Sequence, residues 1–258
     1  MKILLSFILA GAWISGATLL GERRGSKKAG LIANLPSNIV LSLIFMALTS
    51  GPGYAAETTR GVPVGMAIDT LFVLVFMLVV KRGLGKALLA SLGVWAAAAL
   101  IFIRAIPPLS TAGAISLYMV VFVLCFSIAE WGLQVRMTEK RPSSPSWKQI
   151  AVRALFAGTV VAGAVTVAQF APPYMTGILS TFPAVLSSTL VIFTLSQGAD
   201  FARATGKILI LSSSNIIVYA ITAGATFTSM GPWLGSLLAF LASLVYISLL
   251  NLLVAKIR

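Results

Sequence analysis

The chain has no histidine and only one cysteine, and these two shortages exclude several kinds of chemistry. Without histidine, a Ser-His-Asp catalytic triad cannot form, and neither can a zinc site built from histidine and cysteine ligands. The single cysteine, Cys125, cannot form a disulfide framework within the chain. We therefore expect that the protein is not an enzyme and that it holds neither a cofactor nor a metal ion.

Charged residues are also scarce. They make up 10% of the 258 residues, with only six Asp and Glu, whereas apolar residues make up 59%. About a quarter of a globular chain is normally charged, and the mean hydropathy here is +1.01. Apolar runs of about 20 residues recur along the chain, each long enough to cross the hydrocarbon core of a bilayer. Because backbone groups in lipid must bond within their own segment, and the alternating pattern of a membrane barrel is missing, these runs should be helices. The sequence predicts an all-α, polytopic transmembrane helix bundle.

The apolar runs predict about nine transmembrane helices, and the basic residues between them predict the orientation. With the N-terminus outside, 16 of the 19 Lys and Arg fall on the cytoplasmic side, as the positive-inside rule requires. We therefore expect a multi-pass protein of the cell (inner) membrane with its C-terminus in the cytoplasm. The expected spans are 3–20, 33–50, 62–80, 85–103, 112–134, 150–170, 178–196, 206–226 and 232–254.

Two other interpretations fit the sequence less well. The formal net charge of +13 is typical of some nucleic-acid-binding proteins, but here the basic residues form no dense tail or stripe. The first span resembles a signal peptide, with Lys2 before an apolar stretch, but a similar segment stands in the middle of the chain. The partner that we expect is the lipid bilayer, and we expect no nucleic acid.

A weak internal repeat appears when the sequence is compared with itself at an offset of 147 positions. Between positions 3 and 60, 12 of 58 residues are identical without a gap. Several of the matches are residue types that fix backbone geometry. They are Gly30 with Gly177, Pro36 with Pro183, and Gly51 with Gly198.

The repeat divides the chain into residues 1–110, 111–149 and 150–258. The first and last parts contain four spans each, and the middle part supplies the fifth span and a loop rich in Pro and Ser. Since five crossings separate a helix from its counterpart, the counterpart crosses the membrane in the opposite direction. We therefore expect an inverted 4+1+4 repeat, the arrangement on which many secondary transporters are built. A membrane scaffold that was merely enlarged by duplication is the alternative.

Two short motifs, NLPSN at 34–38 and STFPA at 180–184, occupy equivalent places in the two repeats. Proline is favoured in the first turn of a helix, so helices should begin near Pro36 and Pro183. From each proline to the next shared glycine is about 15 residues, or about 22 Å, which is shorter than a core of about 30 Å. Helix N-termini inside the membrane can bind anionic or polar groups. A continuous helix kinked at the proline is the alternative.

Asp69 lies about nine residues into the third span, near the middle of the bilayer. An ionisable side chain at this depth is costly and points to a functional site, so we expect Asp69 to bind a cation or a proton. Ser213 and Asn215 lie at a similar depth in the eighth span. Hydrogen bonding of Asp69 for helix packing is the alternative. The candidate binding residues are Asn34, Pro36, Ser37, Asn38, Asp69, Ser180, Thr181, Pro183, Ser213 and Asn215.

The two repeats also resemble a known kind of membrane protein. In each, a glycine precedes an apolar–Pro pair, a short apolar helix and a polar loop rich in Gly and Ala, as in GLIANLPS at 30–37 and GILSTFPA at 177–184. This pattern resembles GlpM-like membrane proteins and a related family built on a domain of unknown function. The resemblance implies a fused two-repeat form of a unit of three or four helices. It implies no substrate and no site residues.

Together these patterns predict a secondary transporter or permease for a small polar or anionic solute, coupled to a proton or cation, with alternating access around a midplane site. The alternative is a non-transporting membrane accessory or assembly protein, which predicts a packed interior and tolerance of Asp69→Ala. An intramembrane enzyme is disfavoured, because acid–base or nucleophilic chemistry needs more than one positioned group. Glu130, at the cytoplasmic end of the fifth span, is expected to be structural. The sequence leaves the solute and a homo-oligomeric state open.

Overall fold

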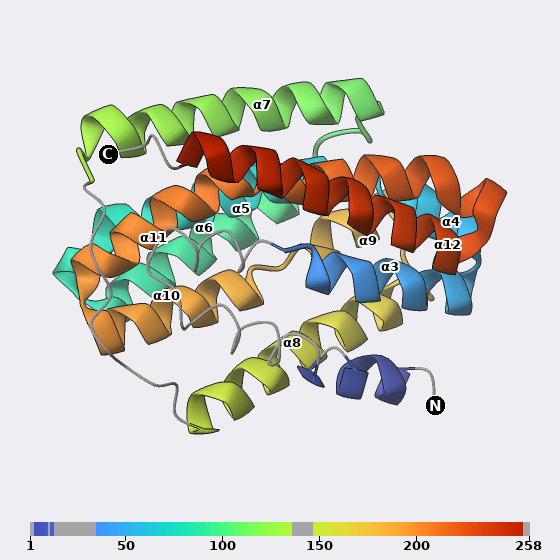
Figure 1. Cartoon of the computed structure of the whole chain (residues 1–258), viewed down its shortest axis with the longest axis horizontal. Helices are drawn as coiled ribbons and strands as arrows, with labels where there is room; N and C mark the ends of the chain where they lie inside the picture. The colour runs from blue at the N-terminus through green and yellow to red at the C-terminus, as the bar shows by residue number, and fades with distance from the viewer. Residues whose placement is uncertain (1–2, 10, 13–34, 136–146, 255–258) are drawn as a thin grey trace.

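The computed structural model describes residues 3–9, 11–12, 35–135 and 147–254, and there every regular element is a helix (Figure 1). The prediction of an all-α chain is confirmed. The first five labelled helices are α3 (Ser37–Ser50), α4 (Pro52–Thr58), α5 (Val62–Val79), α6 (Leu84–Arg104) and α7 (Thr111–Ser127). The second five are α8 (Trp147–Val167), α9 (Pro173–Ser180), α10 (Ala184–Gln197), α11 (Ala199–Ser212) and α12 (Ser214–Val254). A 3-10 turn at Val80–Arg82 extends α5, and a π turn at Ile128–Gly132 extends α7.

Five helical segments of the described chain are long and apolar enough to cross a membrane, as in a multi-pass membrane protein. The last of them, Ala199–Leu252, covers two of the nine expected spans, because the chain folds back at Gly231 within α12. Two shorter apolar helices, Asn38–Ser50 and Gly158–Val167, lie within two more expected spans. Most of the expected first span falls outside the described residues. The other four segments are Val62–Arg82, Leu84–Arg104, Thr111–Gly132 and Pro173–Gln197.

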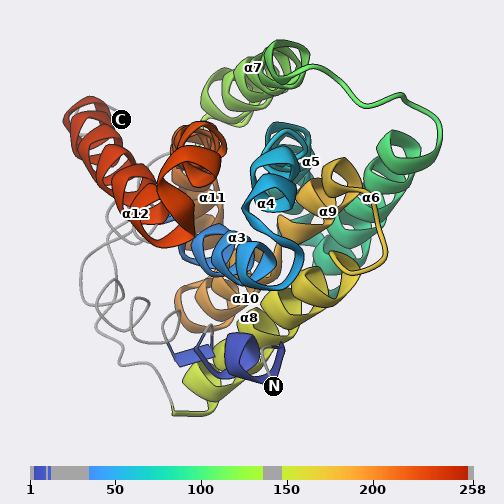
Figure 2. The ribbon, with the colours of Figure 1, turned by 90° about the vertical axis from the view of Figure 1, so that its right-hand side faces the viewer.

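Helix α5 forms the centre of the bundle. Every residue from Gly61 to Thr70 is buried, and α5 packs against α6, α7, α9 and α11 (Figure 2). By contrast, α6, α7 and the second half of α12 present large apolar side chains outward, among them Leu89, Val120 and Leu241. An outward apolar surface is what a helix in contact with lipid tails requires.

The backbone repeats itself at the offset found in the sequence. Helices α3 and α10 have the same length of 14 residues, and their bounds differ by 147 at both ends. Each ends at a glycine with an almost identical conformation, Gly51 at φ 98° and ψ 155° and Gly198 at φ 95° and ψ 168°. The other two glycines with positive φ in the described chain are Gly83 and Gly231, which are 148 positions apart. Local sequence therefore fixes the same turns in both halves, because L-residues avoid this conformation.

Contacts between the halves are reciprocal at the same offset. Gly206 lies against Met77, so closely that an added Cβ would be 2.8 Å from the Met77 Cγ. Gly224 lies against Thr59. Gly206 is 147 positions after Thr59, and Gly224 is 147 positions after Met77. Each contact is thus the counterpart of the other at the same offset.

A second reciprocal contact joins the helical start of the chain to α8. An added Cβ at Gly11 would lie 2.9 Å from the Ala154 carbonyl oxygen, and one at Gly158 would lie 2.7 Å from the Phe7 carbonyl oxygen. Again the offset is 147 for both glycines and for both of their neighbours. The reciprocal contacts therefore include the helical start of the chain and α8.

Equivalent helices run in opposite directions. In Figure 1, α3 leads to α4 at the right-hand end of the molecule, whereas α10 leads to α11 at the left-hand end. The halves are not identical, however. The first half breaks between α4 and α5 at residues 59–61, where the second half stays helical, and the second half breaks at Ser213, where α5 continues.

Candidate functional site

Two helices start in the interior of the molecule. Helix α3 begins after Pro36 (φ −73°, ψ 35°), and α10 begins after Pro183 (φ −78°, ψ 48°). The predicted helix starts are confirmed. Neither start has a side-chain hydrogen bond to cap it, so N–H groups of both first turns lack the partner that a capping residue normally supplies.

The segment before α10 shows how the chain reaches this interior start. Helix α9 ends at Ser180, and three residues, Thr181 to Pro183, separate it from α10. The span Pro173–Gln197 is therefore a discontinuous helix rather than a continuous one. In the equivalent place of the first half, the chain before Leu35 lies outside the described residues.

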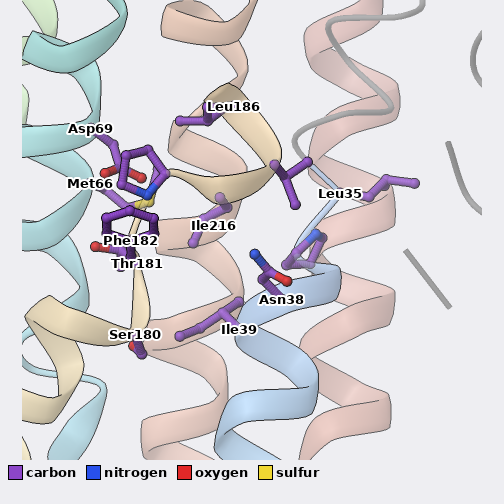
Figure 3. A pocket seen from close by; sticks show the side chains of 13 residues that line it. Leu35, Asn38, Ile39, Met66, Asp69, Ser180, Thr181, Phe182, Leu186 and Ile216 are labelled. Carbon is purple, nitrogen blue, oxygen red and sulfur yellow. The ribbon is translucent and has the colours of Figure 1, made fainter. Parts of the chain in front are cut away.

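A cavity of about 50 Å³ lies between the two helix starts (Figure 3). Ten of its 13 lining residues form five pairs that are offset by 147 positions, so the cavity lies between equivalent segments of the two halves. The pairs are Leu35 with Phe182, Pro36 with Pro183, Asn38 with Val185, Ile39 with Leu186, and Asp69 with Ile216. The remaining three are Met66, Ser180 and Thr181. The two polar members of these pairs, Asn38 and Asp69, both belong to the first half and have apolar counterparts in the second.

Asp69 is the single acidic or basic residue among those that line the cavity. Its side chain is only 3% exposed, and its Oδ1 accepts a hydrogen bond of 2.8 Å from the indole Nε1 of Trp95 in α6. The Trp95 ring in turn packs edge-on against Phe182 at 5.0 Å between centroids. Trp95 therefore links the carboxylate to the break between α9 and α10.

Three further polar groups line the cavity. The hydroxyls of Ser180 and Thr181 donate to the carbonyls of Gly177 and Ile178, each at 2.8 Å. Thr181 also packs against Gly65, one helical turn before Asp69 on α5. The side-chain oxygen of Asn38 is buried without a hydrogen-bond partner among the described residues.

The structure thus brings together most of the candidate residues from the sequence but not all of them. Six of them line one cavity, namely Pro36, Asn38, Asp69, Ser180, Thr181 and Pro183. Asn34 and the side chain of Ser37 lie outside the described part of the chain. Ser213 and Asn215 do not line this cavity: Ser213 is hydrogen-bonded to Tyr118 at 2.7 Å, and Asn215 accepts a bond of 2.9 Å from Ser243.

Two partners were missed by sequence reasoning. Trp95 is one, because the sequence does not indicate which side chain its indole will contact. The other is Lys207, which is completely buried in α11 and forms an ion pair with Glu130. The repeat pairs Lys207 with Arg60, but this pairing does not indicate that Lys207 is buried.

A wider groove of about 580 Å³ opens at the surface between α4, the start of α5, the start of α7 and α12. Arg60 lines this groove, with its side chain 41% exposed and 3.3 Å from the Glu57 carboxylate. Arg60 and Lys207 therefore occupy equivalent positions in the repeat but opposite environments, one in an open groove and one completely buried.

No family model matches the chain, and neither a curated protein nor a solved structure matches it. The resemblance to GlpM-like proteins therefore stays a prediction.

Proposed function

We propose that the chain is a secondary transporter that carries a small polar or anionic solute by alternating access around the cavity between α3 and α10. The observation that carries this proposal is the position of that cavity between equivalent segments of the two halves, at two interior helix starts. In transporters built from inverted repeats, the binding site lies at the repeat interface and is formed by discontinuous helices.

The inverted 4+1+4 repeat is part of the proposal. Its support is the reciprocal glycine contacts, the matched conformations of Gly51 and Gly198, and the opposite directions of α3 and α10. The proposed orientation places the N-terminus outside and the C-terminus in the cytoplasm of an inner membrane. Its support is the distribution of basic residues. One end of the bundle carries basic loops such as the turn with Lys81 and Arg82, whereas only three Lys and Arg of the full chain fall at the other end.

Differences between equivalent places in the two halves support alternating access. At the proposed cytoplasmic end, the buried pair of Lys207 and Glu130 closes the space between α11 and the end of α7. At the proposed outer end, the equivalent Arg60 lines an open groove. Two repeats that exchange these conformations would open the cavity alternately to each side, which is the rigid-body exchange of inverted-repeat transporters.

A solute-independent experiment tests this function. A single cysteine is placed at Ile216, which lines the cavity opposite Asp69, in a Cys125→Ser background, and the protein is reconstituted in vesicles. We expect a membrane-impermeant thiol reagent to label Ile216→Cys from either side of the membrane. The matched control is Ile217→Cys, the next residue along α12, which is buried in the hydrophobic core.

The alternative function, a membrane accessory or assembly protein, gives the opposite result. It requires no access to the interior, so Ile216→Cys would stay unlabelled from both sides, and Asp69→Ala would leave function intact. A separate pair of cysteines tests the orientation: Lys86→Cys and Pro108→Cys, both exposed, should be labelled from opposite sides. Labelling of both from one side would contradict the proposed topology.

A further inference from the structure

We infer that the cavity binds a small zwitterion, a solute that carries an ammonium and a carboxylate a few bonds apart, as the smallest amino acids do. The inference rests on the proposed transport function and names the substrate class of the same site. It follows from the separate acceptor and donor groups of the cavity, from the cost of burying a net charge and from the size of the cavity.

One part of the cavity offers hydrogen-bond acceptors. Asp69 is 97% buried and uses only its Oδ1, toward Trp95, so its second oxygen has no hydrogen-bond partner among the described residues. Ser180 and Thr181 have committed their hydroxyl protons to carbonyls of α9, so their oxygens are left to accept. An ammonium has three N–H donors and no acceptor. These three acceptors, which line one cavity, match that requirement.

Another part offers hydrogen-bond donors. The first backbone bonds within the two helices are Val40 N–H to Pro36 C=O and Ser187 N–H to Pro183 C=O, both 2.8 Å. The N–H groups that precede them in each first turn have no acceptor within the helix, and among them the Ala184 N–H donates instead to the Phe182 carbonyl at 2.7 Å. A helix N-terminus also carries about half a positive charge, which favours a carboxylate. Here two such ends meet at one cavity.

The cost of burying charge also favours a dipolar solute. A solute with no net charge adds none to the cavity, whereas an anion or a cation alone would add a net charge in a buried place where an unpaired charge is costly.

An anion could also be compensated by a proton on Asp69. A protonated carboxyl, however, supplies only one hydrogen-bond donor, so the hydroxyl oxygens of Ser180 and Thr181 would still lack a donor. The other charged residues on the elements that pack against α5, including the turn that follows it, do not line the cavity. They are Lys81, Arg82, Lys86, Arg104, Glu130, Asp200, Arg203 and Lys207. The tyrosines Tyr118 and Tyr174 on those elements do not line it either.

The size of the cavity limits the solute further. On the same measure about 10–15 Å³ holds one water molecule, so 50 Å³ matches a solute of a few non-hydrogen atoms. Glycine and alanine are of this size, and leucine is larger.

Binding to the purified full-length protein tests the inference, with the shift in thermal unfolding temperature and equilibrium titration as readouts. The probes are glycine and alanine, acetate as the anion alone, methylamine as the cation alone, and leucine as the oversized zwitterion. We expect glycine and alanine to stabilise the protein and the other three to have no effect at the same concentrations. Asp69→Asn should weaken glycine binding about thirtyfold or more, because it removes the partner of a buried charge. Asp200→Asn, at an exposed acid, is the matched control and should bind as the unsubstituted protein does.

Each result either supports or contradicts the binding of a zwitterion. If acetate stabilises the protein as well as glycine does, and Asp69→Asn preserves that effect, the site is an anion site and the inference is wrong. Stabilisation by methylamine alone makes it a cation site, and no stabilisation by glycine or alanine also overturns the inference. The comparison of probes needs no variant, so a poorly folded Asp69→Asn protein does not obscure it. Labelling of Ile216→Cys from both sides preserves the transport proposal in each of these cases, whereas its absence contradicts transport whatever the binding result.

Discussion

Lys207 and Glu130 form a buried ion pair across 77 positions of sequence, between the middle of α11 and the π turn that follows α7. The Lys207 ammonium also donates a hydrogen bond of 3.2 Å to the Val135 carbonyl. The lysine side chain is 1% exposed and the glutamate side chain is 27% exposed. The pair ties the helix between the two halves to the second half.

Removal of one partner of this pair should destabilise the protein. A buried charge that loses its partner costs about 3–5 kcal/mol. Glu130→Gln should cost more than Lys207→Met, because it leaves the buried Lys207 behind, whereas Lys207→Met leaves a glutamate that is 27% exposed. The double variant Lys207→Met, Glu130→Leu should recover most of the loss, because it leaves no unpaired charge. Thermal unfolding in detergent measures both. The control is Lys81→Met, which breaks an exposed pair with Asp200 at 2.8 Å and should cost less than about 1 kcal/mol.

The crossing of α9 with the start of α5 should not tolerate a methyl group. An added Cβ at Gly177 would lie 2.9 Å from the Gly61 Cα, and one at Gly61 would lie 3.1 Å from the Gly177 Cα. Either Gly→Ala substitution forces the two backbones apart, which should cost about 1–3 kcal/mol or more. Gly85→Ala is the control, since nothing lies within 4 Å of its added Cβ. Equal unfolding temperatures for Gly177→Ala and Gly85→Ala would contradict this close approach.

Gly51→Ala and Gly198→Ala should be destabilising to a similar degree. Both glycines have a positive φ and an extended ψ, a combination that is essentially restricted to glycine and costs other residues about 1–3 kcal/mol. There is open space around both positions, so the effect would come from the backbone alone. Unfolding experiments on the two variants measure it, with Gly53→Ala in α4 as the control. A large effect at one position and none at the other would contradict the equivalence of the two turns.

Trp95→Phe should remove the hydrogen bond to Asp69 while it keeps most of the packing around the ring. The phenyl ring retains most of the packing against Phe182 but cannot donate to the Asp69 Oδ1. We expect a loss of about 1 kcal/mol, the usual worth of a hydrogen bond between membrane helices. A double-mutant cycle with Asp69→Leu isolates the pair, and a coupling energy of zero would show that the bond contributes nothing. Trp131→Phe, at a side chain that is 73% exposed, is the control.

Features that depend on nearby residues could be predicted from the sequence. The starts of α3 and α10 follow from Pro36 and Pro183, because proline fixes its own φ and is favoured where a helix begins. The matched turns at Gly51 and Gly198 follow in the same way, since the conformation there excludes other residues. Long apolar runs identified the helices because lipid leaves the backbone no other way to bond.

The composition of the cavity could be predicted only in part. The paired prolines and Asp69 were found, since an acid at bilayer depth is conspicuous in any sequence. Ser213 and Asn215 were expected beside it by depth alone, yet they face Tyr118 and Ser243. Depth along a helix can be counted from the sequence, but the rotation of the helix about its axis depends on packing against its neighbours.

The sequence by itself determined where helices begin, where they turn and how the two halves correspond, because these depend on φ preferences and on apolar length within one segment. Only the tertiary structure decided that Trp95 holds Asp69, that Lys207 finds Glu130 and that Arg60, its equivalent, lines an open groove. Trp95 and Asp69 are 26 positions apart, and Lys207 and Glu130 are 77 positions apart. No local preference can select between the many side chains at the same depth. Packing of whole helices against α5 made that selection.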